Sequence, residues 1–161
     1  MPSPPAPTRA VHWLEHPART ALAAVISLVV ARGIGLPEAY WAPLTTIVVT
    51  QSSVRAALDA GGERLAGTAL GAVAGALIAV YWNASLAALA AGILVLGILC
   101  AALKLSNSAY RLAGITLIIV LIIPHAHAPW LLAWQRFLEV AIGIAVALGL
   151  TAAWPEGAAS N

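Results

Sequence analysis

The feature that most constrains the fold is a series of six apolar segments separated by short connections. They lie at about 19–36, 39–55, 64–82, 84–103, 108–124 and 130–154. Crossing a bilayer takes about 17 to 25 apolar residues, so the first two segments are at the short end. Only 9% of the residues are charged, whereas a soluble domain carries about a quarter. The sequence therefore predicts an all-α, polytopic membrane protein with six transmembrane helices.

The two ends of the chain differ from this apolar body. Residues 1–16 begin with a proline-rich stretch, which predicts a disordered tail followed by a short interfacial helix. Residues 17–156 are expected to form one six-helix membrane domain, and residues 157–161 a short C-terminal tail. We expect no separate soluble domain.

Lysine and arginine positions predict the orientation in the membrane. With the N-terminus inside, the basic residues on the inner side would be Arg9, Arg19, Arg55, Arg64, Lys104 and Arg111. Only Arg32 and Arg136 would lie near the outer side. We therefore expect a multi-pass protein of the bacterial inner membrane with both termini in the cytoplasm.

The stretch from Tyr40 to Gly71 predicts two closely packed helices joined by a charged turn. Pro43 lies inside the first apolar part, so we expect a kink or support from neighbouring helices there. Glycines recur every fourth residue in the second part, at Gly67, Gly71 and Gly75. Such a stripe lets another helix approach closely.

Some spacings in this stretch recur in the second half of the chain. The matching pairs are Arg64–Gly71 with Arg136–Gly143, and Tyr40–Thr46 with Tyr110–Thr116. Two halves of three helices each would have opposite orientations, as in inverted-repeat transporters. The alternative is chance similarity between apolar helices. A real 3+3 repeat would bring the second and fifth segments together at a polar centre.

Charged residues inside apolar segments are the first candidates for a site. Arg136 and Glu139 are three residues apart, so they share one face of a helix. They could attract an anion and take up a proton, or form an interfacial pair with Arg136 between Trp130 and Trp134. Arg64 and Arg111 could also attract an anion, or serve only as topology charges.

The second segment combines an aromatic side chain with several hydrogen-bonding groups. Trp41, Thr45, Thr46 and Gln51 could hold a planar ligand that carries a carboxylate. Alternatively, Trp41 lies at the membrane interface and the threonines bond to their own helix backbone.

Metal and enzyme signals are weak. His12 to His16 fit the pattern H-x-x-E-H, but a zinc site needs a third ligand and a water-filled cleft. His125 and His127 lie in a short loop, where solvation is the simpler interpretation. We expect no enzyme activity, no metal or other cofactor and no nucleic-acid partner.

The chain resembles the fusaric acid resistance protein-like and aromatic acid exporter superfamily, over about residues 17–156. The matching pieces are Tyr40-Trp41-Ala42, Thr45, Thr46, Val48-Val49, Gln51, Arg64, Gly67-Thr68, Gly71, Tyr110, Thr116, Arg136, Gly143 and Trp154-Pro155. The resemblance implies proton-driven efflux of aromatic carboxylic acids or related small organic anions and drugs. Larger members carry two such units and soluble domains, so a single unit suggests a homodimer.

These observations give one leading hypothesis, a homodimeric efflux transporter of small organic anions. Its substrate-binding candidates are Trp41, Thr45, Thr46, Arg64, Tyr110, Arg111, Thr116 and Arg136. Trp41 and Tyr110 would stack on a ring, and Glu139 would couple transport to protons. The alternatives are a passive organic-anion channel and a non-transporting membrane scaffold or partner subunit.

Overall fold

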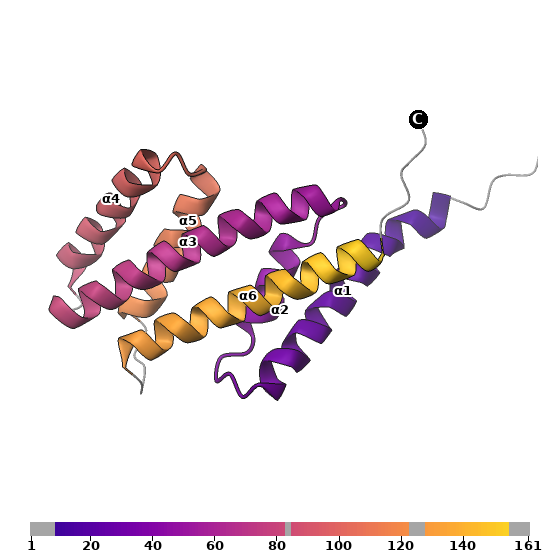
Figure 1. Ribbon diagram of the computed structural model, residues 1–161, viewed down its shortest axis with the longest axis horizontal. Coiled ribbons are helices and arrows are strands. Elements are labelled where there is room, and N and C mark those ends of the chain that lie inside the picture. The colour runs from indigo at the N-terminus through magenta and orange to yellow at the C-terminus, as the bar shows by residue number, and fades with distance from the viewer. Residues whose placement is uncertain (1–8, 83–84, 123–127, 155–161) are drawn as a thin grey trace, which may run out of the picture.

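The computed structural model describes residues 9–82, 85–122 and 128–154, and this part of the chain contains six helices and no strand (Figure 1). The helices are α1 (Arg9–Gly33), α2 (Trp41–Val49), α3 (Val54–Tyr81), α4 (Leu86–Ala102), α5 (Asn107–Ile122) and α6 (Pro129–Ala153). The predicted all-α fold with six helices is confirmed. Residues 1–8 and 157–161, which the expectations for the two tails concern in part, lie outside the described residues. The loop that contains His125 and His127 also lies outside them. The predicted domain boundaries stay a prediction.

The two long helices α3 and α6 run beside each other through the centre of the molecule (Figure 1). The pair α1 and α2 packs against α6 on one flank. The pair α4 and α5 packs against α3 on the other flank. The centre of the bundle is therefore formed by α2, α3, α5 and α6.

The second helix is shorter than the sequence predicted. It ends at Val49, because Thr50 adopts an extended conformation with ψ 117° and its hydroxyl donates to the Thr46 carbonyl. The next helix begins at Val54, where the Ser53 hydroxyl accepts a hydrogen bond from Ala56 N. The expected charged turn is therefore wrong, since those residues form the first turns of α3. Nine residues of α2 span only about 14 Å, which is too short to cross a bilayer.

Two prolines of the N-terminal half lie inside helices. Pro43 lies in the first turn of α2, where its missing N–H leaves no intrahelical hydrogen bond unmade, so it causes no kink. Helix α1 begins at Arg9 and contains Pro17, whereas the first apolar segment was expected to start near residue 19. It ends before Gly35, whose φ of +82° suits glycine.

The glycine stripe of α3 packs against α5 of the same chain. A methyl group at Gly71 would collide with the Ala113 carbonyl oxygen, and one at Gly75 would lie 2.9 Å from the Val120 Cβ. A methyl group at Gly67 would likewise collide with the Ala109 carbonyl oxygen. The stripe is thus used for close helix packing inside the protomer, where the approaching helix is α5.

The outer surface of the bundle is strongly apolar. Leu94 and Ile98 on α4 are 66% and 63% exposed, and Val29 on α1 is 63% exposed. By length and composition, α3 and α6 could each cross a membrane, while α4 and α5 are shorter apolar helices. Large exposed apolar surfaces of this kind face lipid or another protein.

The contact at Gly71 gives a stability prediction. Gly71→Ala should lower the free energy of unfolding of the detergent-purified protein by about 1–3 kcal/mol, because the added methyl group overpacks against the α5 backbone. The control is Gly149→Ala, where nothing lies within 4 Å. Alanine there should be neutral or raise stability by up to about 1 kcal/mol through helix propensity. Equal melting temperatures for the two variants would contradict the close α3–α5 packing.

Candidate functional site

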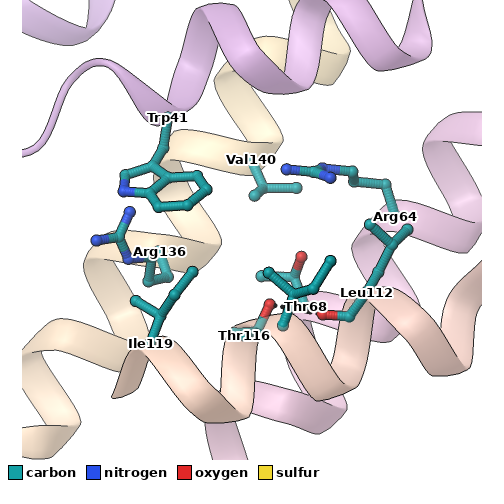
Figure 2. Close-up of a pocket in the computed structure, with 9 residues that line it drawn as sticks. Trp41, Arg64, Thr68, Leu112, Thr116, Ile119, Arg136 and Val140 are labelled. Carbon is teal, nitrogen blue, oxygen red and sulfur yellow. Dashed lines mark hydrogen bonds between the residues drawn. The ribbon is translucent and has the colours of Figure 1, made fainter. Parts of the chain in front are cut away.

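A small cavity lies where α2, α3, α5 and α6 meet (Figure 2). The residues that line it are Trp41, Arg64, Thr68, Leu112, Ile115, Thr116, Ile119, Arg136 and Val140. Its volume of about 20 Å³ is enough for one water molecule. In this conformation the cavity is therefore closed to an aromatic ligand.

Arg136 is held on one side of the cavity by three groups. Its Nη1 donates to Glu139 Oε2 at 3.2 Å, and its Nη2 donates to Glu38 Oε2. The guanidinium carbon lies 4.4 Å from the centroid of the Trp41 ring, a cation–π contact that Figure 2 shows. The Arg136 side chain is only 3% exposed, so it does not extend to the interface between Trp130 and Trp134, as one interpretation expected.

The three charged residues Glu38, Arg136 and Glu139 form a triad with two carboxylates and one guanidinium, in which Arg136 and Glu139 are buried and Glu38 is partly exposed. Glu139 is fully buried. Within the described residues, its Oε1 and the Nε of Arg136 have no hydrogen-bond partner. Because buried charges are stable only when paired, each member of the triad depends on the others.

Arg64 enters the cavity from α3, on the side opposite Trp41 and Arg136 (Figure 2). Its Nε donates to the Thr45 hydroxyl at 3.3 Å. Within the part of the chain that the structure describes, no carboxylate pairs with this guanidinium. The cavity thus contains one arginine with two counter-charges and one arginine with a neutral hydroxyl partner.

Of the predicted site residues, Thr46, Tyr110 and Arg111 do not line the cavity. Thr46 donates to the carbonyls of Ala42 and Gly143 and so joins α2 to α6. Tyr110 packs in the apolar cluster of α3, α4 and α5, with its ring near Gly97. Arg111 is exposed to the outside and does not line the cavity. The Thr116 hydroxyl bonds back to the Leu112 carbonyl at 2.9 Å, although its side chain does line the cavity.

Three residues that make contacts in or near the site were not predicted as site residues. Glu38 reaches Arg136 from the connection between α1 and α2, and Thr68 lines the cavity from α3. The sequence signal that could have identified Glu38 is its position three residues before Trp41. Arg19, expected to be a topology charge, is fully buried and donates to the carbonyls of Gln51 and Trp154 at 2.6 and 2.9 Å. It therefore joins α1 to the ends of α2 and α6.

A metal site has no support in the described part of the chain. No three His, Cys, Asp or Glu side chains come together there as potential ligands. The side chains of residues 11–15, which include His12 of the H-x-x-E-H pattern, lie outside the described residues.

The fold and the cavity define an apolar helical protein with two arginines, Arg64 and Arg136, at a central cavity and the buried Glu139 paired with Arg136. The profile of the family described as "Fusaric acid resistance protein-like" matches residues 19–150, so the chain belongs to this family. Membership indicates a membrane protein with a transport-related role. No curated protein and no solved structure gave a match.

The triad gives a second prediction. Arg136→Ala should lower the free energy of unfolding by about 3–5 kcal/mol, because it leaves the buried Glu139 without its counter-charge. Adding Glu139→Gln should restore part of this loss, since a neutral amide is cheaper to bury. The measurement is a double-mutant cycle from thermal unfolding in detergent. Purely additive effects would show that the two side chains do not interact.

Proposed function

We propose that this protein carries small organic anions across the membrane, with aromatic carboxylates as the preferred substrates and export as the direction. The observation that carries the proposal is Arg64. It projects into a shared cavity with a hydroxyl partner only, and a substrate carboxylate would supply the missing counter-charge. Guanidinium groups suit this task because they can donate two parallel hydrogen bonds to a carboxylate.

The rest of the cavity fits the organic part of such a substrate. The Trp41 indole offers an aromatic face, and Leu112, Ile119 and Val140 offer apolar walls. Thr68 and Thr116 lie between the two arginines (Figure 2). An anion with a ring would therefore find a charged end and an apolar end in one site. Since about 20 Å³ excludes a ring, the substrate must bind in a more open conformation.

We further propose that the two halves form a 3+3 inverted repeat, and that these halves would move relative to each other during transport. The proposal is supported by helix contacts that correspond when α1, α2 and α3 are exchanged for α4, α5 and α6. The corresponding pairs are α1–α2 with α4–α5, α1–α6 with α3–α4, α2–α3 with α5–α6, and α2–α6 with α3–α5.

Glycine contacts support the same repeat in detail. Gly71 on α3 lies against the Ala113 carbonyl and Thr116 on α5, and Gly143 on α6 lies against the Ala42 carbonyl and Thr45 on α2. In this register Thr45, rather than Thr46, corresponds to Thr116. The two halves could then rock against each other around the cavity.

The membrane arrangement belongs to the same proposal. The chain would lie in the bacterial inner membrane with both termini in the cytoplasm, as its lysines and arginines indicate. It would act as a homodimer, so that two copies supply the two units of larger family members.

Transport in liposomes tests the role of Arg64. Arg64→Gln should reduce uptake of benzoate at least tenfold at equal protein content, because the substrate loses its counter-charge; a tenfold loss corresponds to about 1.4 kcal/mol. Arg111→Gln is the matched control, since Arg111 is exposed outside the cavity. If Arg64→Gln transports as well as the wild type, the cavity is not the anion site.

Proton coupling is tested at Glu139. In Glu139→Gln liposomes, benzoate accumulation should no longer respond to an imposed pH gradient, because an amide cannot take up the coupling proton. The buried position of Glu139 beside Arg136 supports this role. Unaltered coupling would exclude Glu139 as the proton site. Benzoate current without an opposing proton flux in the wild type would instead indicate a passive channel.

A further inference from the structure

The carboxylate of Glu38 occupies a ready-made anion site at the edge of the cavity. Its Oε2 accepts hydrogen bonds from the Tyr40 hydroxyl at 2.8 Å, from Trp41 Nε1 at 3.2 Å and from Arg136 Nη2. These donors come from the α1–α2 connection, the start of α2 and the N-terminal third of α6. A phenol, an indole and a guanidinium converging on one oxygen would hold any carboxylate in the same way.

We propose that these three donors form a carboxylate-binding subsite for the transported anion, and that Glu38 is a tethered competitor that fills it in the closed state. The inference rests on the proposed function, because it assumes that the cavity admits an organic anion, whose carboxylate would pair with Arg64 and occupy this subsite in turn. An incoming carboxylate would displace the Glu38 carboxylate and take over its hydrogen bonds. One carboxylate replaces another, so no donor of the subsite is left buried and unpaired.

Burial indicates which carboxylate of the triad can leave. The Glu38 side chain is 24% exposed, whereas Arg136 and Glu139 are 3% and 1% exposed. Glu139 belongs to the same helix as Arg136 and would keep the guanidinium in place after the exchange. Glu38 lies outside the helices, so it can move without breaking helical hydrogen bonds.

The exchange also accounts for the closed cavity. Glu38 bonds to Trp41 and Arg136, and both of these side chains line the cavity. Its release would vacate the space that the Glu38 side chain fills beside Trp41 and Arg136, next to the cavity. A competitor that occupies the subsite nine-tenths of the time would weaken the apparent affinity about tenfold, because only one molecule in ten is competent to bind.

Calorimetric titration of the detergent-purified full chain with benzoate tests this subsite. Glu38→Gln should bind benzoate about tenfold more tightly than the wild type, because the neutral amide competes poorly for Arg136. Glu38→Asp keeps the charge but is one methylene too short to reach Arg136, so it should shift affinity in the same direction. Asp59→Asn, which removes an exposed charge on α3, should match the wild type. Neutral benzamide should show no gain in any variant.

The outcomes separate the subsite from the proposed function. Tighter benzoate binding in Glu38→Gln and Glu38→Asp supports the competitor. Unchanged or weaker binding in both, with binding still lost in Arg64→Gln, overturns the competitor and leaves the anion site standing. Absence of benzoate binding in the wild type and in all variants overturns both.

Discussion

Burial of the Arg136 guanidinium is the constraint on which the centre of this protein depends. A charge in an apolar bundle is stable only when its counter-charges are buried with it. Here the counter-charges come from Glu139 on the same helix and from Glu38, almost a hundred residues earlier in the chain. The Trp41 ring packs against the Arg136 guanidinium. The triad therefore fixes the α1–α2 connection and α2 against α6.

The remaining walls of the cavity are positioned by close helix contacts at two glycines. Gly71 lets α5 approach α3, and Gly143 lets α2 approach α6. Each approach leaves no space for a side chain at the glycine. The two arginines of the cavity differ in their partners. Arg136 on α6 pairs with two carboxylates, whereas Arg64 on α3 donates to the Thr45 hydroxyl and pairs with no carboxylate among the described residues.

Much of the fold followed from the sequence, because long apolar runs bounded by serine, glycine and proline leave few choices but helix. Helices α4, α5 and α6 were predicted within two residues at each end. The α2–α3 boundary was not, because Ser53 and Thr50 decide it through local hydrogen bonds that hydropathy does not register. In the site, Arg136 and Glu139 were paired correctly because helical spacing alone brings them together. Glu38 and Thr68 were missed because their roles arise from long-range contacts.

The sequence by itself determined an all-helical, apolar chain of the fusaric acid resistance protein-like family, since composition and periodicity fix which segments are helical. It also limited the charged candidates to a few residues. Only the tertiary structure decided which of these candidates meet. It placed Arg64 and Trp41 in one cavity, Tyr110 in an apolar cluster and Arg111 on the surface. The physical reason is that helix crossing depends on side-chain fit between distant segments, and the periodicity of one segment carries no information about its partner.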